Sequence, residues 1–154
     1  MTNAIEPYLQ RTRIAYFSME IALRPDMHTF SGGLGVLAGD TARSAADLEL
    51  PMVFVSLLTR AGYVRQEIRD GRQVAQANPW RPQDHATPLD TMAALRIEGR
   101  EVWVRPWLYR EICPLGHCIP VLLLDTDVEV NSPADRQITH QLYGGAGAGA
   151  AGAA

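Results

Sequence analysis

The sequence predicts an α/β fold with a mixed sheet, and two patterns lead to this prediction. Residues 14–58 read as strand, glycine-rich turn, helix and strand, which is typical of a βαβ unit with parallel strands. Two short turn signals, Asp70-Gly71 and Glu98-Gly99-Arg100, are each flanked by strand-like segments and indicate antiparallel β-hairpins. A sheet that contains both is part parallel and part antiparallel.

The βαβ unit begins with the apolar and aromatic run Ile14–Met19, which predicts a strand that Ile21–Leu23 extends as a buried stretch. Arg24–Ser31 contains Pro and Asp and predicts a loop. Gly32-Gly33-Leu34-Gly35 then opens a helix that must end before Pro51. Its core-facing positions, by helical spacing, are Leu34, Leu37, Ala38, Thr41, Ala45 and Leu48.

The rest of the chain predicts further strands and one helix. Ser132 is a typical N-cap with Pro133 after it, so we expect a helix to about Tyr143 that Gly144 ends. The expected strands are Met52–Leu58, Tyr63–Ile68, Arg72–Ala77, Ala93–Ile97, Glu101–Trp107 and Val121–Asp125. Residues 1–144 form the predicted domain. The Gly/Ala segment Gly145–Ala154 has no side chain that could anchor it, so we expect a disordered tail.

The composition excludes several classes of function. The chain has 154 residues, of which 14 are Arg and none is Lys, so no Walker A or Schiff-base lysine is present. A net charge of −3 gives no reason to expect nucleic-acid binding. No apolar run is long enough to cross a membrane, and the opening residues lack a secretory signal, so we expect a cytoplasmic protein.

The two cysteines, Cys113 and Cys118, are interpreted as free thiols because nothing places the chain in an oxidising compartment. His117 lies between them, but no fourth ligand stands at a zinc-like spacing. We therefore expect no metal site here.

The glycine-rich loop is the most informative feature. Glycines let a backbone approach a ligand closely, and the N-terminus of the following helix favours an anion such as phosphate. The alternative is a tight turn that binds nothing. A dinucleotide fingerprint starting at Gly33, with Ala38 in its third position and Glu49 downstream, is less favoured, because the loop begins 13 residues after Met19.

Glu20 closes the first strand, where open α/β sheets place ligands. Two interpretations remain open: Glu20 lines a binding cleft, or it is a buried carboxylate that ties down the following loop. Asp125 and Asp127 could form an acid pair, although turn formation is the favoured interpretation.

The other candidate side chains give weaker signals. The four histidines have no partner at a diagnostic spacing and are interpreted as surface or loop residues. The tryptophans could stack on sugar rings or belong to the core. These residues are His28, His85, His117, His140, Trp80, Trp103 and Trp107.

Several motifs occur in one order between Ile14 and Gly145: IAYFSMEIAL, TFSGGLGVLAGDTARSAADLELPMVFVSLL, RAGYVRQ and VLLLDTDVEVNSPADRQITHQLYGG. Together they resemble the N-terminal part of glycogen (α-glucan) phosphorylases, most closely the short bacterial and archaeal type. Starch and glycogen synthases share a GGLG loop but lack the LLDTD and LYGG pattern.

The resemblance implies a partial Rossmann-like N-terminal domain of a GT-B glycosyltransferase. Such enzymes use phosphate to release glucose 1-phosphate from an α-1,4-glucan, with pyridoxal phosphate as cofactor. The residues that would bind substrate and its phosphate are Gly32, Gly33, Leu34, Gly35 and Glu20. The resemblance implies no nucleic-acid or membrane partner and leaves the oligomeric state open.

Departures from the family point to an incomplete enzyme. Family members are several times longer, and their cofactor lysine lies in a C-terminal domain. We therefore expect an inactive N-terminal fragment. Two alternatives stay open: a nucleotide-sugar-dependent GT-B glycan synthase, and a non-catalytic module that binds phosphate or glycan.

Overall fold

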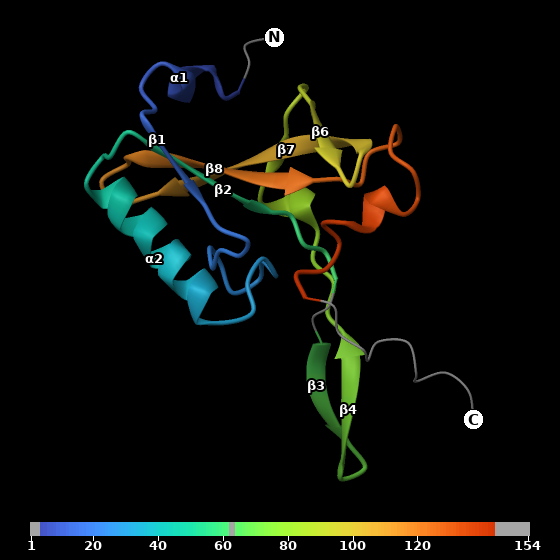
Figure 1. Cartoon of the computed structure of the whole chain (residues 1–154). Helices are drawn as coiled ribbons and strands as arrows, with labels where there is room; N and C mark the ends of the chain where they lie inside the picture. Colours follow the sequence, from blue (N-terminus) through green and yellow to red (C-terminus); the bar gives the residue numbers. More distant parts are fainter. Residues whose placement is uncertain (1–3, 62–63, 144–154) are drawn as a thin grey trace.

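The computed structural model describes residues 4–61 and 64–143, so the predicted tail at 145–154 lies outside the described residues. Figure 1 shows the elements in place. In chain order they are α1 (Glu6–Leu9), β1 (Ile14–Phe17), α2 (Gly33–Asp47), β2 (Met52–Leu57), β3 (Val64–Arg69), β4 (Arg72–Ala77), η1 (Pro82–Asp84), β5 (Thr87–Pro88), β6 (Ala93–Ile97), β7 (Arg100–Ile112), β8 (Cys118–Asp125) and η2 (Asp135–Gln137).

One mixed sheet forms the body of the molecule (Figure 1). β1, β2 and β8 run parallel, with Tyr16 opposite Phe54 and Val55 opposite Leu122. β7 runs antiparallel to β8, and β5 and β6 both pair antiparallel with β7. The predicted α/β class, the βαβ unit and the mixture of parallel and antiparallel pairing are confirmed.

β7 and β8 are longer than predicted. They pair continuously from Arg105 opposite Asp125 to Ile112 opposite Cys118, and a tight turn closes them through the hydrogen bond from the Cys113 amide to the His117 carbonyl. Polar residues interrupt the outer part of this ladder, so apolar runs alone did not reveal its full length. Cross-strand hydrogen bonds hold these outer residues in the strands.

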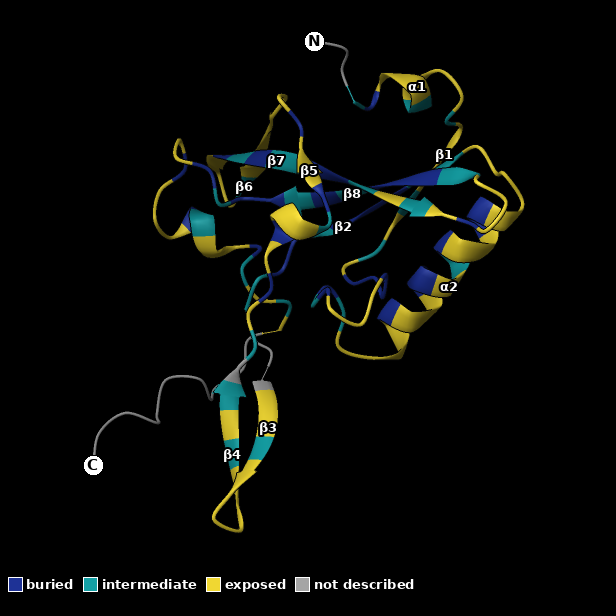
Figure 2. Cartoon of the chain, turned by 180° about the vertical axis from the view of Figure 1, so that it is seen from behind, coloured by how far each residue is buried: buried dark blue, intermediate teal, exposed yellow. Residues whose placement is uncertain are grey.

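Two hairpins form at the predicted turns, although Arg100, expected in the second turn, is the first residue of β7. Asp70 and Gly71 both have positive φ, 51° and 73°, and so do Glu98 and Gly99, 49° and 82°. Two residues in this conformation form the type I′ turn whose twist suits a hairpin. Figures 1 and 2 show that the β3–β4 hairpin projects from the body as a two-stranded ribbon with largely exposed side chains.

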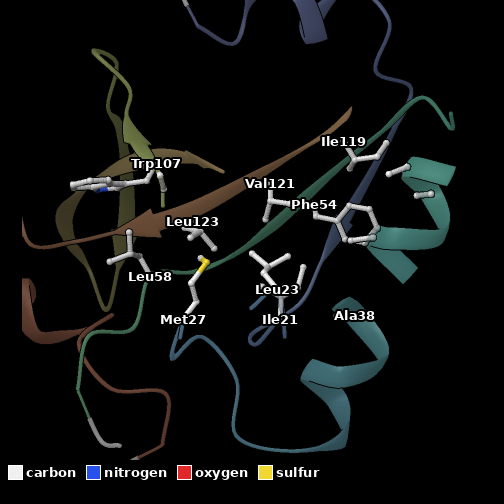
Figure 3. Close-up of a cluster of buried hydrophobic side chains, with 14 of the residues drawn as sticks. Ile21, Leu23, Met27, Ala38, Phe54, Leu58, Trp107, Ile119, Val121 and Leu123 are labelled. Atoms are coloured by element: carbon white, nitrogen blue, oxygen red, sulfur yellow. The ribbon is translucent and has the colours of Figure 1, made fainter. Parts of the chain in front are cut away.

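The core lies between α2, the loop that precedes it, and one face of the sheet. Figure 3 shows apolar side chains from that loop, from β2 and from β8 pointing into one cluster. Phe54, Val121 and Leu123 alternate along their strands with residues on the opposite face. Ile21 and Leu23 are buried as predicted, but in a loop that turns away from β1 toward α2.

The prediction of the core-facing side of α2 was right for Ala38 and Ala45 and wrong for the leucines. The buried residues are Gly35, Ala38, Gly39, Ala42, Ala45 and Ala46, whereas Leu34, Leu37 and Leu48 are 47%, 60% and 69% exposed. The reason is steric. A Cβ on Gly39 would lie 2.1 Å from the carbonyl oxygen of Ala22, so only small residues fit between the helix and this loop. Among the described residues, no helix is long and apolar enough to cross a membrane.

The helix predicted from Ser132 to Tyr143 was also wrong, because only the short helix η2 forms there. The Ser132 hydroxyl does cap the turn by accepting the Asp135 amide. The chain then leaves the helical path, since the amides and hydroxyls of Thr126 and Thr139 bond to each other. Tertiary hydrogen bonds here override a correct N-cap signal.

The close contact between α2 and Ala22 gives a first prediction. Gly→Ala inside a helix normally stabilises a protein by about 0.5–1 kcal/mol. Gly39→Ala should instead lower the free energy of unfolding by about 1–3 kcal/mol, since the new methyl group overpacks the Ala22 carbonyl. Urea unfolding followed by circular dichroism measures the change.

The control for this prediction is Ser44→Ala, an exposed position on the same helix, which should leave stability unchanged or slightly raised. If Gly39→Ala were as stable as the parent chain, α2 would not pack on Ala22 as closely as described.

Candidate functional site

The parallel strands end at one edge of the sheet, and a charged residue stands at the end of each. Glu20 and Arg60 follow β1 and β2, and Asp125 is the last residue of β8. The glycine-rich loop that begins α2 comes back to the same end of the βαβ unit. In open α/β sheets, ligands bind at this edge.

The glycine-rich loop places the N-terminus of α2 at the surface. Gly32 is the N-cap in an extended conformation, with φ −156° and ψ −159°. The next residues, Gly33 and Leu34, are exposed, and a Cβ on Gly33 would meet nothing within 4 Å. First-turn amides have no acceptor within a helix, so these two groups can donate to an anion from outside.

Gly35 has a different role from its neighbours. It is buried, and a Cβ at this position would lie 2.4 Å from the Cβ of Phe30 and 3.3 Å from the Cγ of Glu20. Its carbonyl oxygen accepts the amide of Ala22 at 2.8 Å. Of the predicted loop residues, Gly35 therefore packs the helix against the protein, while Gly33 and Leu34 are exposed.

Glu20 lies directly beneath this loop and is 2% exposed. Its Oε2 accepts the Ser31 amide at 2.5 Å and the Gly32 amide at 3.3 Å. The structure thus brings the predicted residues Glu20 and Gly32–Gly35 together. In it, the carboxylate ties down the loop, which is one of the two interpretations left open by the sequence.

Tyr143 completes the surroundings of Glu20. Its hydroxyl donates to Glu20 Oε1 at 3.4 Å, across 123 residues of sequence. Desolvation, together with the charge of Glu20 and this hydrogen bond, raises the pKa of the Tyr143 phenol. The phenol is therefore protonated at neutral pH and acts as a donor.

A buried ion pair joins the ends of β2 and β8. Both terminal nitrogens of the Arg60 guanidinium donate to Asp125, at 2.7 and 2.6 Å, and the Trp107 indole donates to Asp125 at 3.1 Å. Partial burial lowers the pKa of Arg60, but the hydrogen bonds to Asp125 outweigh it and raise that pKa. These bonds fix the carboxyl edge of the sheet.

Asp125 and Asp127 do not form an acid pair. Asp125 accepts the Asp127 amide at 2.9 Å, as expected of a turn, and Arg136 donates to Asp127 at 2.6 Å. Asp125 pairs with Arg60, whereas Asp127 pairs with Arg136 and also lies 4.0 Å from Arg60. The interpretation as a turn is confirmed.

The remaining candidates, which are the tryptophans, histidines and cysteines, mostly lie in the core or contact neighbouring side chains. Trp80 and Trp107 are in the core, while Trp103 is half-buried. His85 lies 3.4 Å from Asp26, and His28 Nε2 lies 3.1 Å from the Asn78 amide nitrogen. Cys113 is buried and Cys118 half-buried, and both are free thiols. Within residues 4–61 and 64–143, no group of three metal-ligating side chains comes together.

Sequence reasoning missed Arg60 and Tyr143. Arg60 stands three residues after β2, as Glu20 does after β1, so its position at the carboxyl edge was available as a signal. Tyr143 gave no such signal, because its contact with Glu20 depends on the path of the chain after η2. What the arrangement offers chemically is a pair of outward amides at a helix N-terminus, which suits an oxyanion such as phosphate.

Several proteins similar to this chain are named as phosphorylases. The chain is 36% identical over 138 residues to the maltodextrin phosphorylase of Thermococcus litoralis. It is 38% identical over 141 residues to the glycogen phosphorylase of Mycobacterium tuberculosis, and 31% identical over 139 residues to that of Aquifex aeolicus. No protein-family profile matches the chain.

These matches cover 84–87% of this chain but only 16–19% of the length of the relatives. The chain is homologous to one segment of the glycogen and maltodextrin phosphorylases, and the resemblance carried by its motifs is confirmed.

The ion pair at the sheet edge gives a second prediction. Removing one partner of a buried pair leaves an uncompensated charge, so Asp125→Ala and Arg60→Ala should each lower the free energy of unfolding by about 3 kcal/mol. The double variant should lose much less than the sum. Urea unfolding of the four proteins measures this coupling.

The matched control is the exposed pair Arg24–Asp26, whose side chains are 49% and 55% exposed. Arg24→Ala should cost less than about 1 kcal/mol. Additive losses for Arg60 and Asp125 would contradict the direct pairing.

Proposed function

We propose that this chain supplies the phosphate-binding loop of an α-glucan phosphorylase, which uses phosphate to release glucose 1-phosphate from an α-1,4-glucan. The observation that carries the proposal is the exposed pair of amides, Gly33 and Leu34, at the N-terminus of α2. It stands in a chain that is homologous to phosphorylases over most of its length.

The proposed role of the loop is electrostatic. Negative charge on the phosphate oxygens would meet the Gly33 and Leu34 amides and the positive end of the α2 dipole. These donors lie in exposed residues of a helix that is packed closely on the protein, so little reorganisation would be needed when charge develops during glycosyl transfer. The absence of side-chain atoms around Gly33 lets phosphate approach the backbone.

We further propose that residues 1–144 form part of a Rossmann-like N-terminal domain of a GT-B fold. One face of β1 and β2 supports this. Phe17 and Met19 are 74% and 44% exposed there, around a hollow of about 230 Å³ that Val55, Leu57 and Leu124 also line. Parallel strands are normally covered on both faces, so further polypeptide would complete the domain.

The cofactor that the family name implies, pyridoxal phosphate, does not fit this chain. The cofactor is held through a Schiff base to a lysine, and none of the 154 residues is Lys. We therefore derive no step through the cofactor. We expect no release of glucose 1-phosphate from maltooligosaccharides by this chain alone, and such release would contradict the proposal.

The proposed function is tested by removing one amide of the loop. Gly33→Pro deletes the Gly33 donor at the first helical position, where proline fits, and the extended Gly32 before it is compatible with proline. We expect inorganic phosphate to bind roughly tenfold or more weakly, since a hydrogen bond to a charged group is lost. Phosphate titration followed by amide NMR measures the Kd.

The matched control is Gly33→Ala, which adds a methyl group in open space and keeps the amide. It should bind phosphate within a few-fold of the parent chain. Equal affinities for the Pro and Ala variants, or unshifted Leu34 amide signals in the parent chain, would count against binding at this loop.

A further inference from the structure

We propose that Glu20 is a positioning residue: its buried carboxylate holds Ser31 and Gly32 and so aims the Gly33 and Leu34 amides at the phosphate, without touching the substrate itself. This inference rests on the proposed function, because it concerns the same loop. In this role Glu20 affects the substrate indirectly, by orienting the backbone of the loop.

The burial of Glu20 is the first argument. The residue is 2% exposed, and its Cγ lies 3.3 Å from where a Cβ on Gly35 would stand. A substrate hydroxyl could reach the carboxylate only if the loop moved aside. A ligand bound to the outward amides therefore meets the loop, with Glu20 behind it.

The division of the loop amides is the second argument. Ser31 and Gly32 donate their amides to Glu20 Oε2, whereas the Gly33 and Leu34 amides lie in the first turn of α2 and have no acceptor within the helix. Two amides fixed on one carboxylate oxygen determine the orientation of the peptide groups that follow. The position of Glu20 therefore decides where the Gly33 and Leu34 amides point.

Hydrogen bonds fix the chain before and after the glycine-rich loop, and the Glu20 carboxylate holds Ser31 and Gly32 between them. Before the loop, the Thr29 hydroxyl donates to the Ile21 carbonyl at 2.6 Å. After it, the Ala22 amide donates to Gly35, and Arg43 donates to the Ala22 and Leu23 carbonyls. Between these anchors, the Ser31 and Gly32 amides donate to the Glu20 carboxylate at the end of β1.

The charge of Glu20 separates positioning from direct binding. A carboxylate behind an anion site repels the anion, so its charge opposes phosphate binding while its hydrogen bonds assist it. In Glu20→Gln the amide oxygen can still accept from Ser31 and Gly32, and the new NH₂ group can donate to the Tyr143 oxygen. Glu20→Ala removes both the charge and the hydrogen bonds.

The experiment compares these two variants with the parent chain by two measurements. Amide hydrogen exchange at Ser31 and Gly32 should be roughly tenfold or more faster in Glu20→Ala and nearly unchanged in Glu20→Gln, since only Ala loses the acceptor. The Kd for inorganic phosphate should rise roughly tenfold in Glu20→Ala and fall roughly two- to fivefold in Glu20→Gln.

Two controls accompany the variants. Leu37→Ala, on the 60% exposed side of the same helix, should change neither measurement. Tyr143→Phe should leave exchange at Ser31 and Gly32 unchanged, because Tyr143 contacts the other carboxylate oxygen.

The outcomes are distinct. Equal weakening of phosphate binding by Gln and Ala would overturn the inference, because the carboxylate itself would then be required. If amide hydrogen exchange at Ser31 and Gly32 were unchanged in Glu20→Ala, the claim that Glu20 holds the loop would be overturned. No phosphate binding by any protein would overturn the proposed function and the aiming of the amides, and the exchange rates would still decide whether Glu20 holds the loop.

Discussion

The close packing of α2 on the loop around Ala22 is the constraint on which the rest of this structure depends. Gly39 faces the Ala22 carbonyl with no room for a Cβ, and Gly35 faces Phe30 in the same way. Arg43 adds hydrogen bonds to the Ala22 and Leu23 carbonyls. Because the helix lies so close, its first turn has one position relative to the end of β1.

This contact connects the core to the candidate site. Ile21 and Leu23 are buried among the side chains of β2 and β8, so packing against the sheet holds the loop that carries Glu20. The Glu20 carboxylate then reaches the Ser31 and Gly32 amides from a position that the core sets. A short chain of contacts thus runs from hydrophobic packing to the exposed amides of Gly33 and Leu34.

The carboxyl edge of the sheet is fixed in a second way, by charge. Arg60 and Asp125 stand at the ends of neighbouring parallel strands and bond through the two terminal guanidinium nitrogens, and the Trp107 indole also donates to Asp125. The pair is largely shielded from water, so its geometry is better defined than that of an exposed pair. The packing of α2 and the Arg60–Asp125 ion pair therefore both stabilise the carboxyl ends of the parallel strands.

The sequence by itself determined most of the strands, the hairpin turns, the start of α2 and the family to which the chain is homologous. These are local features: Asp70-Gly71 fixes a turn by its own backbone preferences, and MVFVSL reads as a buried strand in any context. The glycine-rich loop and Glu20 were also found together, since both follow from the order of strand, loop and helix.

Tertiary structure alone decided which face of α2 is buried, what Glu20 bonds to, and where the chain goes after η2. Helical spacing favoured the leucines Leu34, Leu37 and Leu48, but the backbone at Ala22 lies too close for any large side chain, so the glycines and alanines face inward. The Thr126–Thr139 hydrogen bonds likewise ended a helix that local signals supported. In each case a contact between residues distant in sequence outweighed a local preference.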